Sequence, residues 1–141
     1  MKIVICGSMS FSKQMQEADD VLIARGHQVT LPRKTIEHAR GDESWKLGVE
    51  ESAERKIKYD LIRDYYSKIR ETDAILVVNF EKNGIKNYIG ANTFLEMGFA
   101  HVLHKRIFVL NNLPEQDYLI EEVRAMRPCV LEGDYERIGG I

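Results

Sequence analysis

One acidic side chain, Glu96, stands in an otherwise apolar segment at residues 94–100. Gly90, Asn92 and Thr93 precede it and are residue types that commonly cap helices, and the apolar positions that follow recur at helical spacing. A carboxylate at such a helix start has two interpretations. It is either a structural acid stabilised by the positive end of the helix, or a catalytic carboxylate in a cleft. The residue types alone favour the structural interpretation.

A second candidate for chemistry is the loop formed by Gly7, Ser8, Met9 and Ser10, which precedes an amphipathic segment at residues 12–25. A loop that enters a helix presents free backbone N–H groups to an anion, and serine hydroxyls add donors. The sequence contains neither GxGxxG nor GxxxxGK[ST], so it has no dinucleotide fingerprint and no P-loop. A phosphate site and a plain turn that caps the helix both stay open.

These residues can act together only if the fold brings them to one place. Five short apolar runs are typical of buried strands, and they cover residues 3–6, 28–31, 73–78, 106–110 and 128–131. Helical patterns lie between them, over residues 12–25, 50–71, 90–103 and 119–126. The alternation predicts one α/β domain over residues 1–141, a flavodoxin- or Rossmann-like three-layer sandwich. We expect a five-stranded, mostly parallel sheet in the order 2-1-3-4-5.

Such sheets bind ligands beyond the carboxyl ends of their strands, where both candidate segments begin. Residues 33–49 are charged and irregular, which predicts a mobile loop or lid. Trp45 within this segment either stacks on a ligand base or pins the loop to the body of the protein. Cys6 and Cys129 lie in apolar strand contexts, which predicts buried, reduced thiols and a cytoplasmic location.

The composition argues against several classes of protein. With 141 residues, 44% hydrophobic and 30% charged, the chain suits one ordinary globular domain. A net charge of −2 provides no basic field, so no nucleic-acid partner is expected. The apolar runs are far shorter than the roughly 20 residues of a membrane span, so no membrane partner is expected. The histidines and cysteines form no HExxH or CxxC motif, and we expect neither a metal nor a cofactor.

Three segments, ICGSMSF, TDAILVVN and ANTFLEMGFA, together resemble the nucleoside 2-deoxyribosyltransferase superfamily, which includes the 2'-deoxynucleoside 5'-phosphate N-hydrolases. The resemblance runs from about residue 2 to residue 110. Its best single motif is a glutamate followed by a hydrophobic residue, glycine, an aromatic residue and alanine, which here begins at Glu96. The resemblance implies an enzyme that cleaves or transfers at the N-glycosidic bond of a nucleoside 5'-monophosphate or nucleoside.

The same resemblance implies roles for the two candidate segments. Glu96 would be the nucleophile that attacks the anomeric carbon of the sugar. The loop from Gly7 to Ser10 would contact the 5'-phosphate. The partner would be a small-molecule nucleotide or nucleoside, and the protein would be a homodimer or a larger oligomer in which a neighbouring subunit completes the pocket.

The sequence departs from the family at one position. The family has an aspartate near the end of the helix before the third strand, and ungapped alignment on Asp73 places Tyr65 there. Asp64 lies one residue earlier, a rotation of about 100° on a helix. Tyr65 is our preferred candidate because the ungapped alignment needs no helix shift, but Asp64 stays open. Asp73 is a third candidate for contact with the leaving base.

The remaining expected substrate contacts are Asn79, directly after the third strand, and Gly90 and Asn92 at the start of the next helix. The stretch Asn-Tyr-Ile-Gly-Ala-Asn, residues 87–92, also differs from the shorter glycine-rich approach common before the family's glutamate, so the substrate preference of either branch does not transfer. Two hypotheses from different classes stay open. The motif at Glu96 favours an enzyme of N-glycosidic bonds, whereas the departure at Tyr65 favours a nucleotide-binding or sensing protein without catalysis.

Overall fold

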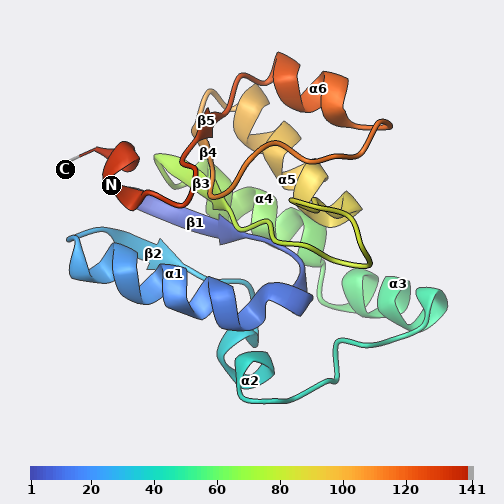
Figure 1. Ribbon diagram of the computed structural model, residues 1–141. Helices are drawn as coiled ribbons and strands as arrows, with labels where there is room; N and C mark the ends of the chain where they lie inside the picture. The colour runs from blue at the N-terminus through green and yellow to red at the C-terminus, as the bar shows by residue number, and fades with distance from the viewer. Residues whose placement is uncertain (140–141) are drawn as a thin grey trace.

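A computed structural model describes residues 1–139, and its centre is a five-stranded sheet. The strands are β1 (Lys2–Cys6), β2 (Gln28–Thr30), β3 (Ala74–Val77), β4 (Arg106–Val109) and β5 (Cys129–Val130). Their order is β2-β1-β3-β4-β5, and all four neighbouring pairs are parallel. The predicted α/β fold and strand order are confirmed (Figure 1).

Helices cover both faces of the sheet (Figure 1). α1 (Ser12–Ala24) lies on one face, after the 3-10 turn η1 (Met9–Phe11). α4 (Leu61–Arg70), α5 (Ala91–Val102) and α6 (Ile120–Ala125) lie on the other. α2 (Thr35–Ala39) and α3 (Val49–Lys58) lie in the segment that joins β2 to α4, and η2 (Tyr135–Ile138) is the last element of the described chain.

Two apolar cores result from the alternation of strand side chains. Ile3 and Ile5 of β1 pack with α1, whereas Val4 and Cys6 of the same strand pack with α4, α5 and α6. All four side chains are fully buried. Cys6 therefore points to the face of the sheet on which α4 and α5 meet.

The single helix predicted over residues 50–71 is wrong, because the chain breaks it into α3 and α4. Asp60 between them adopts a left-handed backbone with φ 48° and ψ 45°. Aspartate is one of the few residue types that tolerate this conformation. A new helix therefore starts at Leu61, with Asp64 in its first turn and Tyr65 directly after it. Both residues lie at the start of a helix and not, as predicted, near the end of one.

The irregular loop predicted over residues 33–49 contains a short helix, α2, in which Thr35 and His38 are buried. The Thr35 hydroxyl donates to the carbonyl of Pro32 at 2.6 Å. By contrast α3 buries none of its side chains, and its apolar residues Val49 and Ile57 are 88% and 79% exposed. α3 is therefore an outlying helix with little contact to the core.

The two cysteines differ in environment. Cys6 is buried as predicted, but Cys129 is exposed, so the prediction for Cys129 is wrong. β5 is a two-residue strand at the edge of the sheet and pairs only with β4, which leaves its side chains partly uncovered. Within residues 1–139, no helix has the length and apolar character that crossing a bilayer requires.

Candidate active site

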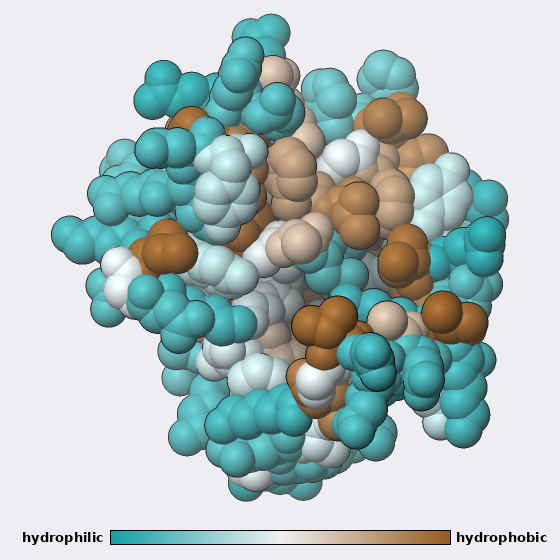
Figure 2. All heavy atoms as spheres, turned by 90° about the vertical axis from the view of Figure 1, so that its right-hand side faces the viewer, coloured by the Kyte–Doolittle hydropathy of each residue, from teal (hydrophilic) through white to brown (hydrophobic). Residues whose placement is uncertain are grey.

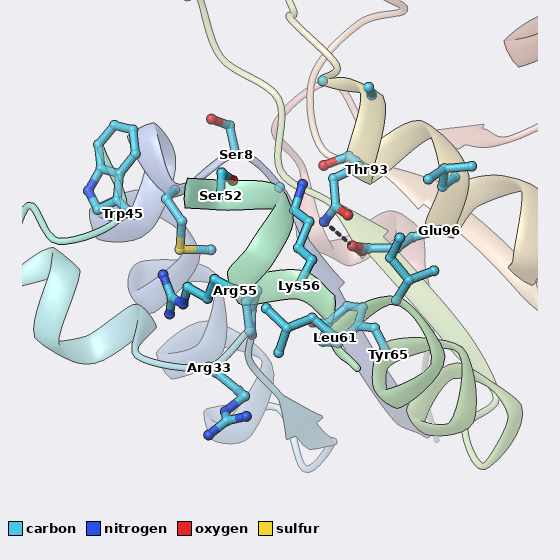
Figure 3. Close-up of a pocket in the computed structure, with 18 of the residues that line it drawn as sticks. Ser8, Arg33, Trp45, Ser52, Arg55, Lys56, Leu61, Tyr65, Thr93 and Glu96 are labelled. Carbon is cyan, nitrogen blue, oxygen red and sulfur yellow. Dashed lines mark hydrogen bonds between the residues drawn. The ribbon is translucent and has the colours of Figure 1, made fainter. Parts of the chain in front are cut away.

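A cavity of about 410 Å³ opens beyond the carboxyl ends of β1 and β3, where such sheets bind ligands. It is formed by segments far apart in the sequence (Figure 3). Its lining residues are Gly7, Ser8 and Met9 of the β1–α1 loop; Pro32, Arg33, His38 and Trp45; Ser52, Arg55 and Lys56 of α3; Leu61, Ile62, Asp64 and Tyr65 of α4; Lys82, Tyr88 and Gly90 of the β3–α5 loop; and Ala91, Asn92, Thr93, Leu95, Glu96 and Phe99 of α5.

Glu96 lies in the second turn of α5 and is only 5% exposed. The first turn of α5 contains no acid, and the helix-terminus effect fades beyond it, so the structural interpretation of Glu96 loses its basis. Asn92 Nδ2 donates to Glu96 Oε1 at 2.7 Å. Glu96 Oε2 is buried and has no hydrogen-bond partner within residues 1–139. A buried carboxylate oxygen that lacks a partner at a cavity wall indicates a place for a ligand.

Burial raises the pKa of Glu96 to about 7, whereas the nearby Cys6 thiol and Lys56 ammonium lower it by less. The thiol lies beside the carboxylate but outside the geometry of a regular hydrogen bond to Oε2, and thiols are weak donors. Burial, followed by the charge of Glu96, raises the pKa of Cys6 well above its usual range. Cys6 is therefore a neutral thiol, and Glu96 exchanges its proton near neutral pH.

The structure brings Asp64 and Tyr65 to the same cavity as Glu96, because the break at Asp60 restarts the helix there. The buried hydroxyl of Tyr65 donates to the carbonyl of Ile5 in β1. Burial raises the pKa of Tyr65 well above its usual range, with smaller contributions from neighbouring Cys6, Glu96 and Asp64, so this phenol keeps its proton. Asp64 forms an ion pair with Lys68 at 3.0 Å. Each of the two candidates therefore already has a partner.

Three of the four residues of the Gly-Ser loop, Gly7, Ser8 and Met9, line the cavity, whereas Ser10 does not. A Cβ atom on Gly7 would lie 2.9 Å from the carbonyl oxygen of Val78, so close packing against the backbone that follows β3 requires glycine. The Ser8 side chain caps η1 by accepting from the backbone N–H of Ser10 at 3.3 Å. The loop is therefore held tightly at the cavity wall.

Two residues that we predicted to contact the substrate, Asp73 and Asn79, form hydrogen bonds to backbone groups instead. Asp73 lies at the amino end of β3, opposite the cavity, and its carboxylate accepts from the backbone N–H of Lys2 at 2.7 Å. Asn79 is fully buried, and its amide group bonds three backbone groups, the carbonyls of Asn87 and Asn112 and the N–H of Asn111. Neither side chain lines the cavity, whereas Gly90 and Asn92 do.

Sequence reasoning missed the positive side chains of the cavity, Arg33, Arg55, Lys56 and Lys82. Within residues 1–139 none of the four forms an ion pair with a carboxylate. Three of them project from the segment between β2 and α4, and Lys56 reaches across the cavity toward Glu96 (Figure 3). No spacing in the sequence relates them, because only the tertiary fold places them together. The cavity therefore favours an anionic ligand.

No family model matches the chain, and no curated protein sequence matches it. Two solved structures are similar to it in fold. A CMP N-glycosidase from Clostridium botulinum, BcmB, has a TM-score of 0.48 and 14% identity, over 92% of this chain and 85% of that one. A 2-desoxiribosyltransferase from Leishmania mexicana has a TM-score of 0.45 and 15% identity, over 78% of this chain and 65% of that one.

Among residues 1–139, no group of three or more His, Cys, Asp or Glu side chains is arranged to hold a metal ion. The side chains that the cavity offers include one buried carboxylate, one carboxylate at its edge, a buried phenol and several cations that pair with no carboxylate of the described residues. These groups suit nucleophilic or proton-transfer chemistry on an anionic molecule.

Proposed function

We propose that the protein cleaves or transfers at the N-glycosidic bond of a nucleoside 5'-monophosphate or nucleoside, with Glu96 as the nucleophile. The observation that carries the proposal is the Glu96 carboxylate, which is buried at the cavity wall, with one oxygen bonded to Asn92 and the other without a partner among the described residues. The resemblance of the motif at Glu96 to the deoxyribosyltransferase superfamily supports the same role.

In the first step, an oxygen of ionised Glu96 bonds to the anomeric carbon of the sugar while the bond from that carbon to the base nitrogen breaks. Positive charge develops on the sugar, as in glycoside hydrolysis, and the carboxylate stabilises it. The base leaves with the bonding electrons and needs a proton. Asp64 can supply it after it leaves the ion pair with Lys68 and takes up a proton from solvent. Tyr65, after release from the Ile5 carbonyl, can instead stabilise the leaving base with a hydrogen bond while solvent supplies the proton.

In the second step, the bond between Glu96 and the sugar breaks as an acceptor attacks the anomeric carbon. Water as the acceptor gives hydrolysis, and its proton passes to the group that protonated the base. A second base as the acceptor gives transfer, and the proton that its attacking nitrogen loses passes to the same group. Both outcomes regenerate the Glu96 carboxylate.

The charge of the cavity supports a phosphorylated substrate. Arg33, Arg55, Lys56 and Lys82 line it without carboxylate partners among the described residues, and a phosphate would supply the missing negative charge. A nucleoside without phosphate would leave these cations uncompensated. We therefore favour the 5'-monophosphate over the free nucleoside.

A non-catalytic nucleotide-binding protein is the second candidate function. The observation that favours it is the engagement of both proton donors, Tyr65 with a backbone carbonyl and Asp64 with Lys68. A pKa near 7 also leaves part of Glu96 protonated at neutral pH, and a neutral carboxyl group is a poor nucleophile.

Incubation with nucleosides and their 5'-monophosphates, followed by chromatography of released base, separates the two functions. We expect base release by the wild type and a loss on the order of a thousandfold or more in Glu96→Gln. Glu121→Gln, at an exposed position on α6, is the matched control and should keep full activity. Base release by Glu96→Gln at the wild-type rate would exclude Glu96 as nucleophile. Ligand binding by the wild type without base release would support the second function.

A further inference from the structure

Thr93 lies at the cavity wall on α5, three residues before Glu96. Side chains three residues apart on a helix are neighbours, with Cβ atoms about 5–6 Å apart. Figure 3 shows Thr93 and Glu96 on the same side of α5, facing the cavity. Thr93 is only 2% exposed, and a hydroxyl that is buried to this extent normally has a hydrogen-bond partner.

The usual partners of a threonine hydroxyl in a helix are the carbonyls three and four residues earlier. For Thr93 these are the carbonyls of Gly90 and Ile89. The Gly90 carbonyl accepts from the N–H of Phe94 at 2.9 Å, and the Ile89 carbonyl accepts from Gln116 Nε2 at 3.0 Å. Within residues 1–139 no group forms a hydrogen bond with the Thr93 hydroxyl.

The other two buried threonines of the described chain do have such partners. The hydroxyls of Thr35 and Thr72 donate to carbonyls three residues earlier, at 2.6 and 2.8 Å. Glu96 Oε2 is the only completely buried side-chain oxygen or nitrogen of residues 1–139 that lacks a partner. The unbonded hydroxyl of Thr93 is therefore not enclosed in the core but opens onto the cavity, where a ligand can reach it.

The stereochemistry of nucleotides places one sugar hydroxyl next to this group. In the proposed reaction Glu96 attacks the anomeric carbon from the face of the sugar opposite to the base. In ribonucleotides the 2'-hydroxyl projects from that same face, on the carbon bonded to the anomeric carbon. The side chain beside the attacking carboxylate therefore lies near the 2'-hydroxyl. A hydrogen bond to this hydroxyl strengthens in the transition state of glycoside cleavage.

We propose that the Thr93 hydroxyl binds the 2'-hydroxyl of the sugar and makes the protein prefer ribonucleotides to 2'-deoxyribonucleotides. The two hydroxyls are complementary, because each can donate one hydrogen bond and accept others. A 2'-deoxy ligand would place a methylene group against Thr93 and leave its hydroxyl without a partner, which disfavours that ligand. The position of the sugar rests on the proposed function, in which Glu96 is the nucleophile.

Calorimetry in a Glu96→Gln background, which prevents turnover, tests this preference. The probes are the common ribonucleoside 5'-monophosphates and their 2'-deoxy counterparts. We expect the ribonucleotide of the preferred base to bind about fivefold to tenfold more tightly than its 2'-deoxy counterpart, as for one neutral hydrogen bond. Thr93→Val replaces the hydroxyl by a methyl group and should bring the two affinities to within about twofold of each other. Thr93→Ser keeps a hydroxyl and should retain the preference.

Thr72→Val is the matched control, because it makes the same substitution at a buried threonine that does not line the cavity. It should leave the ratio of the two affinities unchanged. A thermal unfolding scan checks that each variant is folded. With Glu96 in place, base release gives the ratio of kcat/KM for the ribonucleotide to that for its 2'-deoxy counterpart. This ratio should fall about tenfold or more in Thr93→Val, mainly through a lower kcat for the ribonucleotide.

Equal or tighter binding of the 2'-deoxyribonucleotides by the Glu96→Gln protein would overturn the proposal, and so would a failure to bind either sugar at millimolar concentration. An unchanged ratio in Thr93→Val would overturn it as well. Loss of the preference in Thr93→Val, together with no base release by the wild type, would leave this contact intact and remove the proposed enzymatic function. Base release by the wild type, with the same ratio in Thr93→Val, would do the reverse.

Discussion

Asn92 and Glu96 lie one turn apart on α5, and the Asn92 amide holds only one of the two carboxylate oxygens of Glu96. The other oxygen is buried and has no hydrogen-bond partner in the described part of the chain, which is costly for a charged group. Burial accordingly raises the pKa of Glu96 to about 7. Because the fold disfavours the charged form of Glu96, this residue should affect the pH dependence of both stability and activity.

The first prediction concerns stability. The folded protein keeps a proton on Glu96 up to about pH 7, whereas an ordinary glutamate loses it near 4.5. Between these two pH values Glu96 binds more protons in the folded state than in the unfolded state, so the free energy of unfolding falls as pH rises. The Glu96→Gln variant lacks this ionisable group, so its free energy of unfolding does not fall for this reason. Its stability relative to wild type should therefore increase by about 3 kcal/mol from pH 4 to pH 8.

Urea unfolding at several pH values measures this difference. Glu121→Gln, which replaces an exposed glutamate, should show a constant difference from wild type across the range. A Glu96→Gln curve parallel to the wild-type curve would mean that the Glu96 pKa is ordinary in the folded protein.

The second prediction concerns Lys56, whose charge lowers the pKa of Glu96. Turnover should rise as pH passes through about 7, because only ionised Glu96 attacks the sugar. Lys56→Met should move this rise to higher pH, since loss of the cation disfavours the carboxylate. The pH profile of kcat for base release is the measurement. Lys58→Met, on the same helix but outside the cavity lining, should leave the profile in place.

The third prediction separates Asp64 from Tyr65 as the group that assists departure of the base. If Asp64 donates, Asp64→Asn should abolish the fall in rate at high pH that reports a protonated acid. If Tyr65 assists by a hydrogen bond to the base, Tyr65→Phe should remove most of the rate, and the pH dependence of the remaining rate should change little in the acidic range. Tyr65→Phe also leaves the Ile5 carbonyl without its partner and should cost about 1–3 kcal/mol of stability. Rates must therefore be compared under conditions where each variant is fully folded.

The fourth prediction concerns assembly, since apolar side chains are exposed on the face that carries the cavity (Figure 2). Val49, Ile57 and Leu95 are 88%, 79% and 47% exposed, and they belong to α3 and α5, which line the cavity. We infer a homodimer or larger oligomer with this face at the interface. Sedimentation at micromolar concentration should show the oligomer for wild type and a monomer for Ile57→Glu. Ile23→Glu, on α1, is the control and should not dissociate it.

The sheet was predictable because its strands are short, continuous apolar runs, as at residues 74–77. Runs of this kind are typical of parallel strands that are buried on both faces. Glu96 stood out for the same reason, as a lone acid in an apolar segment. The break at Asp60 was not predictable, since the sequence around it contains neither glycine nor proline and continues the helical pattern. That one residue decides whether Asp64 and Tyr65 reach the cavity.

The roles of individual polar residues were harder to predict. Asp73 and Asn79 are polar residues at the two ends of a buried strand, and the fold uses both to hold backbone groups. Lys82 appears in the sequence as one charge in a polar loop. Its position depends on a short hairpin, in which it pairs with Ile85, and on Ser8, 74 residues earlier in the chain. Local patterns predict elements, whereas the partners of a polar side chain depend on contacts between distant segments.

α3 buries none of its side chains, and left-handed residues, Lys34 and Asp60, bound the segment that contains it. A ten-residue helix that packs no side chain into the core is only marginally stable in water. The amide hydrogens of α3 should therefore exchange with deuterium far faster than those of β1 and β3, which exchange only when the whole protein unfolds. Because Arg55 and Lys56 line the cavity, a bound ligand should slow this exchange. Part of the intrinsic binding free energy is then consumed in ordering α3, and the measured affinity is lower than the contacts alone would provide.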